Sequence, residues 1–301
     1  MSPRLALAAA VVSGSLVAVQ QRVNGDLGRS LHDPLLAAVV SFGSGLLLLS
    51  ALVLRAGPRR VLPSVTRVPW WSRIGGLGGA TLVAVGATAA PRIGVALLTV
   101  GLVSGTTLAA LAVDRAGLGP GGHHPLTPPR LLGAALCLLA IGLSTREGLR
   151  AASVGLLSLV VLAGGLIAVQ QALNGRVRAV TGVLVATFVN FAVGTTALLL
   201  GLGLKALVGT VRADRWPSEW WLYLGGAMGA VFIAVAAVTV SVLGVLRLGL
   251  AVTAGQLVGA VLLDVDRGVS VTTLAAVCLT LLAVLISGRK QLWPSTPAPI
   301  G

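Results

Sequence analysis

The chain contains the same sequence pattern twice, and this duplication limits its possible folds more than any other feature. The string AVQQRVNG at 18–25 matches AVQQALNG at 168–175 in six of eight positions. Four of the six glutamines and two of the three asparagines lie in these strings, so an apolar composition alone does not explain the match. Self-similarity at a fixed spacing indicates two structural units of one kind.

Shorter motifs extend the correspondence along both halves. Asp114 aligns with Asp264, although Asp266 is a rival partner. The other matches are Ser41-Phe42-x-x-Gly45 with Asn190-Phe191-x-x-Gly194, Trp70-Trp71 with Trp220-Trp221, Gly75-Gly76 with Gly225-Gly226, Gly79 with Gly229, and Gly105 with Gly255. We therefore divide the chain into a first repeat at 1–147, a second repeat at 151–290 and a C-terminal tail at 291–301.

Each repeat contains five apolar blocks, and composition decides what these blocks are. Apolar residues make up 56% of the chain and charged residues 10%, with a mean hydropathy of +0.98. A soluble domain carries roughly 25% charged residues, so a soluble enzyme, a nucleic-acid binder and a secreted disulfide scaffold are excluded. Ten membrane-spanning helices are expected: Leu5–Val23, Leu35–Leu54, Trp71–Ala89, Gly94–Val113, Leu131–Leu143, Val154–Leu173, Val183–Leu202, Trp220–Val240, Leu248–Leu263 and Val271–Ile286.

Five is an odd number, so the second repeat enters the membrane from the side opposite to the first. The predicted fold class is an all-α membrane protein with ten transmembrane helices, arranged as two inverted five-helix repeats. In the first repeat, eight arginines fall on the side of the N-terminus and three on the other. Because Lys and Arg accumulate on the cytoplasmic side, we expect a multi-pass protein of the plasma (inner) membrane with both termini in the cytoplasm.

Carboxamides in the spans are the candidate substrate-binding groups. On a helix, Gln20 and Asn24 lie one turn apart on one line, and the second repeat has the same line. Amides in a span need polar partners, which leaves two interpretations open. They line a central binding site, or they cap the ends of the first and sixth spans. The candidates are Gln20, Asn24, Gln170, Asn174, Gln21, Gln171, Asn190 and Gln256.

The two halves differ at two of these amides. Asn190 corresponds to Ser41, and Gln256 corresponds to Thr106. An asymmetric pocket and ordinary interhelical hydrogen bonding are both compatible with this difference.

The charged residues near span ends suggest simpler roles. Arg22 and Asp26, spaced i and i+4, are expected to pair with each other. Asp114 and Asp264 end the fourth and ninth spans, where we expect solvated carboxylates that face loops.

Acidic and metal-ligating residues are scarce inside the spans. The only glutamates, Glu147 and Glu219, lie in predicted loops or at a span edge. A proton-coupled exporter of lipophilic cations usually needs a buried carboxylate, so that mechanism is disfavoured. His123 and His124 lack further ligands for a metal. We expect no metal site, no cofactor and no enzyme activity, since no nucleophile and base come together within a span.

The string AVQQRVNGDLGRSLHDPLLAAVVSFGSG and its echo ending ATFVNFAVG resemble the YdcZ-type branch of the drug/metabolite transporter (DMT) superfamily, which is EamA-like. The chain is similar to the fused ten-span form over nearly its whole length. Gly255-Gln256 also fits this branch, whereas Gly105-Thr106 departs from it. Relatives that export cationic drugs carry a first-span glutamate, where this chain has Gln20 and Gln21. The resemblance implies a transporter fold and leaves the substrate open.

These observations predict a secondary transporter that moves a small polar or amphipathic molecule by alternating access. The expected partners are a small-molecule substrate and the lipid bilayer, with no nucleic acid. We expect a monomer with two pseudo-symmetric halves, or alternatively a dimer. A passive channel and a non-transporting membrane scaffold subunit are the rival functions.

Overall fold

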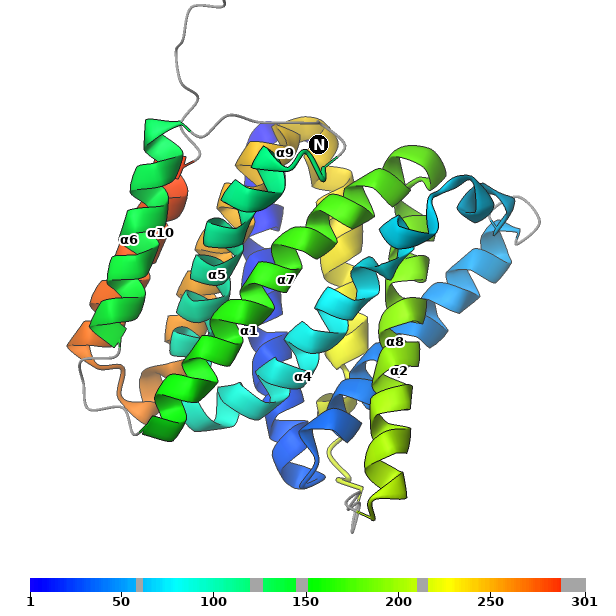
Figure 1. The fold of residues 1–301 in the computed structure, drawn as a ribbon, viewed down its shortest axis with the longest axis horizontal. Helices are drawn as coiled ribbons and strands as arrows, with labels where there is room; N and C mark the ends of the chain where they lie inside the picture. The colour runs from blue at the N-terminus through cyan, green and yellow to red at the C-terminus, as the bar shows by residue number, and fades with distance from the viewer. Residues whose placement is uncertain (58–61, 120–126, 145–150, 210–215, 288–301) are drawn as a thin grey trace, which may run out of the picture.

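The computed structural model describes the whole chain except residues 58–61, 120–126, 145–150, 210–215 and 288–301. Every regular element in the described part is helical (Figure 1). The elements are α1 (Pro3–Ser30), α2 (Pro34–Ala56), η1 (Leu62–Arg67), η2 (Trp70–Gly75), α4 (Gly76–Ile93), α5 (Val95–Arg115), α6 (Pro128–Ser144), α7 (Ala151–Thr181), α8 (Val183–Leu207), η3 (Trp220–Tyr223), α9 (Gly225–Asp264), η4 (Val265–Arg267) and α10 (Val271–Ser287).

The expected all-helical membrane fold is confirmed, and each of the ten predicted segments lies in helical structure. Among the described residues, six helical stretches are long and apolar enough to cross a bilayer. They are Arg4–Ser30, Pro34–Ala56, Trp70–Ile93, Val95–Val113, Val154–Thr181 and Val183–Leu207. The predicted ninth span falls within α9, and the predicted eighth span begins in η3 and continues into α9. The 40 residues of α9 form an arch with two legs (Figure 1).

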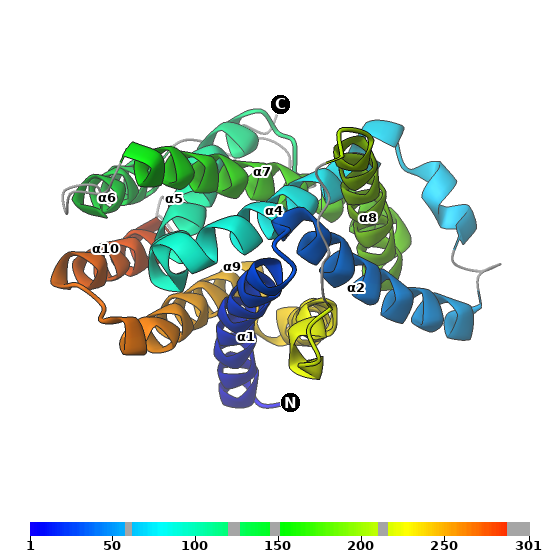
Figure 2. The same ribbon diagram turned by 90° about the horizontal axis from the view of Figure 1, so that it is seen from below.

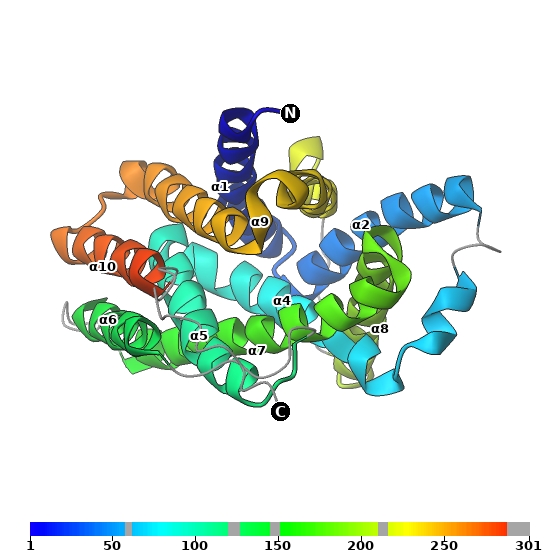
Figure 3. The same ribbon diagram turned by 90° about the horizontal axis from the view of Figure 1, so that it is seen from above.

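Helices of the second repeat run opposite to their counterparts in the first repeat in Figure 1. Helix α1 descends from the N-terminus, whereas α7 ascends. Helix α2 ascends and α8 descends; α5 ascends and the second leg of α9 descends. Figures 2 and 3 show α6 beside α10 at one edge of the molecule and α2 beside α8 toward the other.

The first helix of each repeat packs backbone to backbone against a helix of the other repeat. A Cβ atom on Gly14 of α1 would collide with the carbonyl oxygen of Val252 in α9. In the same way, a Cβ on Gly164 of α7 would collide with the carbonyl oxygen of Leu102 in α5. Small residues allow this approach in lipid, so the glycine faces of the first spans form the contact between repeats.

A hydroxyl group forms a hydrogen bond between the two helices at each of these contacts. Ser15 Oγ donates to the carbonyl oxygen of Gly255 at 2.9 Å, and Thr106 Oγ1 donates to that of Gly164 at 2.9 Å. Hydrogen bonds between helices stabilise association inside a bilayer, where water does not compete. The two repeats are thus joined by the same kind of interaction at both crossings.

The second helices of the repeats, α2 and α8, meet at a pair of aromatic rings. The centroids of Phe42 and Phe191 lie 4.9 Å apart, and both side chains are buried. Each ring also lies against a glycine of the other helix, since Phe191 contacts the site of a Cβ on Gly45 and Phe42 that on Gly194. This reciprocal contact is the centre of a buried apolar cluster.

Candidate functional site

The third span of each repeat begins with a short 3-10 helix that changes to an α-helix where it contacts the other repeat. In the first repeat, the 3-10 helix η2 gives way to α4 at Gly75-Gly76, and in the second, η3 gives way to α9 near Gly225-Gly226. A Cβ on Gly76 would collide with the carbonyl oxygen of Asn190, so only glycine fits there. These junctions bring backbone close to the candidate amides.

Asn24 is the most strongly buried of the candidate amides. Its side chain is fully buried, and neither Oδ1 nor Nδ2 has a hydrogen-bond partner in the described structure. The amide lies against the start of α9, since a Cβ on Gly225 would collide with Asn24 Oδ1 and approach Ser41 Oγ to 2.8 Å. An unsatisfied buried polar group costs about 1–3 kcal/mol, so a group that forms hydrogen bonds with this amide would be stabilised there.

Gln20 lies one turn before Asn24 and contacts the same junction. Its Nε2 atom donates to the carbonyl oxygen of Gly225 at 2.7 Å. The same Nε2 would lie 3.0 Å from a Cβ on Gly229. The line of amides predicted along α1 therefore faces the beginning of α9 in the other repeat.

The second repeat presents the equivalent line to the start of α4. Gln170 packs against Gly78 and Gly79, and its buried Oε1 atom has no hydrogen-bond partner among the described residues. Asn174 faces Gly75 and donates from Nδ2 to Oδ1 of Asn190 at 3.1 Å. The two lines thus occupy equivalent places, but Asn174 has a hydrogen-bond partner whereas Asn24 has none.

The remaining candidates lie further from these junctions. Gln21 is buried against Gly86 of α4, and its Oε1 atom lacks a hydrogen-bond partner in the described structure. Gln171 is exposed on α7. Gln256 is half-buried on α9, where its backbone nitrogen faces Gly14. The structure therefore places Gln20 and Asn24 at the start of α9, and Gln170, Asn174 and Asn190 at the start of α4. Gln171 lies apart from both places.

The interpretation of Asn24 and Asn174 as helix caps is wrong. Helices α1 and α7 are longer than the predicted first and sixth spans that they contain: α1 continues to Ser30 and α7 to Thr181. Both asparagines consequently lie more than a turn before the helix ends, where the backbone is already hydrogen-bonded within the helix.

The expectation of a solvated Asp264 is also wrong. Its side chain is only 8% exposed, and its Oδ2 atom accepts a hydrogen bond from the backbone nitrogen of Ala96 at 2.7 Å. Arg22 Nη1 lies 3.6 Å from Oδ1 and donates to the carbonyl oxygen of Leu263 at 3.3 Å. A carboxylate at a span end is buried here because the start of α5 supplies unpaired N–H groups. The side chain of Asp114 lies outside the described residues.

The predicted ion pair between Arg22 and Asp26 is confirmed, at 3.3 Å. Asp26 also pairs with Arg29 on the same helix, at 2.5 Å. A further ion pair was not predicted from the sequence: Lys205 Nζ lies 2.6 Å from Oδ2 of the fully buried Asp33. Asp33 caps α2 by accepting from the backbone nitrogens of Leu35 and Leu36, and the Asp-Pro that precedes an apolar run was the available signal.

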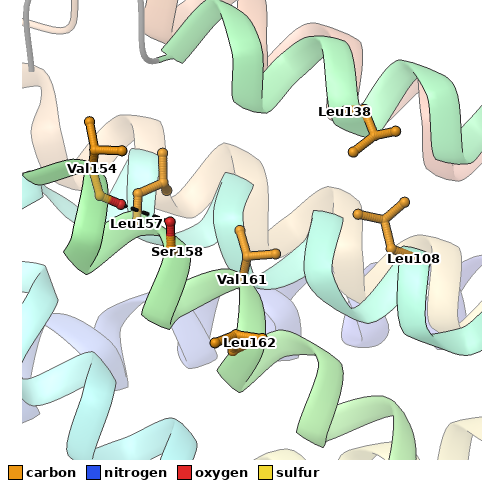
Figure 4. Close-up of a pocket in the computed structure, with 7 residues that line it drawn as sticks. All are labelled: Leu108, Leu138, Val154, Leu157, Ser158, Val161 and Leu162. Atoms are coloured by element: carbon orange, nitrogen blue, oxygen red, sulfur yellow. Dashed lines mark hydrogen bonds between the residues drawn. The ribbon is translucent and has the colours of Figure 1, made fainter.

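A groove of about 340 Å³ lies between α5, α6 and α7, away from the amides (Figure 4). Its only hydroxyl, Ser158 Oγ, donates to the carbonyl oxygen of Val154. The other lining residues are Leu108, Leu138, Leu157, Val161 and Leu162. An apolar groove with no free polar group does not suit a polar solute.

In the described part of the chain, no group of three or more His, Cys, Asp or Glu side chains could hold a metal ion. His123, His124 and Glu147 lie outside that part.

The family described as "Putative inner membrane exporter, YdcZ" (DMT_YdcZ) matches residues 5–143 and again residues 155–286. The chain belongs to this family. The two matched segments coincide with the two repeats, so each repeat separately carries the family's sequence pattern. The assignment makes the chain a multi-pass membrane protein of an exporter family.

A solved structure described as "Crystal structure of protein" is 23% identical, with a TM-score of 0.53 over 95% of this chain and 96% of that one. This similarity concerns the fold alone. No curated protein matches the chain.

Proposed function

We propose that the protein is a secondary transporter that moves a small polar or amphipathic solute across the inner membrane by alternating access. The observation that carries this proposal is the fully buried amide of Asn24, which has no hydrogen-bond partner in the described structure and lies at the start of α9 in the other repeat. Buried polar groups without partners are rare. A solute that binds between the repeats would supply the missing hydrogen bonds.

An inverted arrangement of the two repeats underlies this mechanism. It is supported by the opposite directions of matching helices in Figure 1 and by the reciprocal glycine contacts of α1 with α9 and of α7 with α5. A pair of inverted units can exchange conformations, and this exchange exposes a midplane site to each side in turn.

The chemistry around the site favours an uncharged or zwitterionic group on the solute. We propose that Gln20, Asn24, Gln170 and Asn174 bind it with their carboxamides, which both donate and accept hydrogen bonds. Asn190 holds Asn174 in place through its Oδ1 atom. Because Asn174 already has this partner, the half of the site at Asn24 forms the stronger new hydrogen bonds.

Solute counterflow in proteoliposomes tests the proposal. Purified protein is reconstituted in vesicles preloaded with one unlabelled metabolite from a panel, and uptake of the same labelled metabolite is followed. We expect saturable uptake that is accelerated by the internal solute, as alternating access requires. Unsaturated solute or ion flux would instead indicate a channel, and absence of flux for every panel member, with copurification of a fixed partner, would indicate a scaffold subunit.

A further inference from the structure

We propose that the contact of Asp264 with the start of α5 holds the transporter closed on the face where α1 ends, and that Arg22 keeps Asp264 in this contact. We call this contact the latch, and the opening between α1, α5 and α9 that it closes the mouth. The inference rests on the proposed alternating access, since a latch needs a mouth that opens. It concerns a positioning role for two charged residues that lie beyond the amide site.

The carboxylate of Asp264 bridges helices that the opening of this mouth would separate. It ends the second leg of α9 and accepts from the backbone nitrogen of Ala96, in the first turn of α5. Gly94 precedes α5 with a positive φ of 80°, and a Cβ there would lie 2.7 Å from Asp264 Oδ2. Asp264 therefore caps α5 as an N-cap side chain would, but from the other repeat.

Arg22 makes this cap depend on α1 as well. Its guanidinium faces Asp264 Oδ1 and the carbonyl oxygen of Leu263, at the C-terminal end of α9. A cation is favourable at a helix C-terminus, and a nearly buried carboxylate is costly without a countercharge. Removal of Arg22 would take this countercharge away from the nearly buried Asp264 in the closed state, whereas opening would return the carboxylate to water.

A second ion pair between repeats lies at the same end of the molecule. Lys205, in the last turn of α8, pairs with Asp33, in the turn that follows α1. At the other end, Arg176 of α7 donates to the carbonyl oxygens of Leu118 and Gly117 and lies over the ring of Trp71. Within the described residues, the two ends of the molecule are thus closed by different chemistry, and charge pairs between repeats belong to the end with Asp264.

Cysteine accessibility measures whether this mouth is open. Ala18 lies one turn further into α1 than Arg22 and is fully buried in the cluster that joins α1, α4, α5 and α9. The reporter is Ala18→Cys in a background with Cys137→Ala and Cys278→Ala. A membrane-impermeant maleimide is applied to the reconstituted protein from one face at a time, and the rate of labelling is followed.

We expect Arg22→Ala to accelerate labelling from the Asp264 face about tenfold, because it shifts the population toward the open mouth. Arg29→Ala is the matched control: it removes the same charge from the same helix but breaks a pair within α1, so its rate should match the background. The double variant Arg22→Ala, Asp264→Ala should label no faster than Asp264→Ala alone, as expected for two residues that act as one unit.

Equal labelling of the Arg22→Ala and Arg29→Ala proteins would overturn the latch, as would acceleration from both faces.

If Arg22→Ala does not fold, the reporter protein itself is compared at low and high salt. Screening weakens a partly exposed pair, so labelling should rise with salt, and a constant rate would also overturn the proposal. If counterflow is observed but the labelling tests fail, the latch is wrong and the transporter proposal stands. If the labelling tests succeed but no solute gives counterflow, the transporter proposal alone is contradicted.

Discussion

Replacement of Asn24 by alanine should lower the initial rate of counterflow about tenfold while leaving the thermal stability of the detergent-solubilised protein close to wild type. The amide makes no hydrogen bond to lose in the described structure, and relief of its desolvation cost offsets the packing contacts that its removal takes away. A hydrogen bond to the solute contributes about 1.5 kcal/mol or slightly less, and 1.4 kcal/mol corresponds to a factor of ten. Transport and a melting curve are measured on the same preparation.

Asn174→Ala is the comparison that separates a binding role from a structural role. Asn174 corresponds to Asn24 in the second repeat, but it already has a hydrogen-bond partner, Asn190. Its removal leaves Oδ1 of the buried Asn190 unsatisfied, which should cost about 1–3 kcal/mol of stability. Thr196→Ala, an exposed change on α8, serves as the neutral control. If Asn24→Ala destabilises the protein as much as Asn174→Ala and transports normally, Asn24 has a structural role and not a binding role.

Replacement of Gly255 by alanine should be among the most damaging glycine-to-alanine changes in the described part of the chain. The added Cβ would collide with the carbonyl oxygen of Val11 and lie 2.7 Å from its carbonyl carbon. Backbone atoms cannot rotate away, so α1 and α9 must separate, and the hydrogen bond from Ser15 to Gly255 is strained at the same time. We expect a loss of about 3 kcal/mol, seen as a lower melting temperature and a lower yield of monodisperse protein.

Gly43→Ala is the matched control for this prediction. Gly43 lies inside α2, and nothing lies within 4 Å of a Cβ built there. Alanine favours the helix over glycine by about 0.5–1 kcal/mol, so this variant should be as stable as wild type or slightly more stable. Equal stability of the Gly255→Ala and Gly43→Ala proteins would show that the first and ninth predicted spans do not touch as described.

Most of the helices could be predicted from the sequence because the bilayer imposes their length and apolar character. The duplication also identified the amides that face the other repeat, since Gln20 and Asn24 recur as Gln170 and Asn174. Their partners were harder to predict, because the glycines where the 3-10 helices change to α-helices carry no side chain that marks them. The recurrence of Trp-Trp followed by Gly-Gly was the available signal for these junctions.

Other features of the site could not be predicted because they depend on contacts distant in sequence. Gln21 and Gln171 have the same sequence context, yet Gln21 is buried and Gln171 is exposed, since α1 and α7 have different neighbours at that position. Asp264 looked like a solvated loop residue, because only the folded chain brings Ala96 and Arg22 to it. The lengths of α1 and α7 were underestimated because their last turns are polar and lie beyond the apolar blocks.

The sidedness of equivalent helix ends tests the inverted arrangement most directly. Arg55 lies in the last turn of α2 and Val208 directly follows α8, its counterpart in the second repeat. Single cysteines at these positions, in the background without Cys137 and Cys278, are labelled with an impermeant maleimide in right-side-out and inside-out vesicles. The account predicts that Arg55→Cys reacts from the cytoplasmic side and Val208→Cys from the opposite side. Labelling of both cysteines from the same side would contradict it.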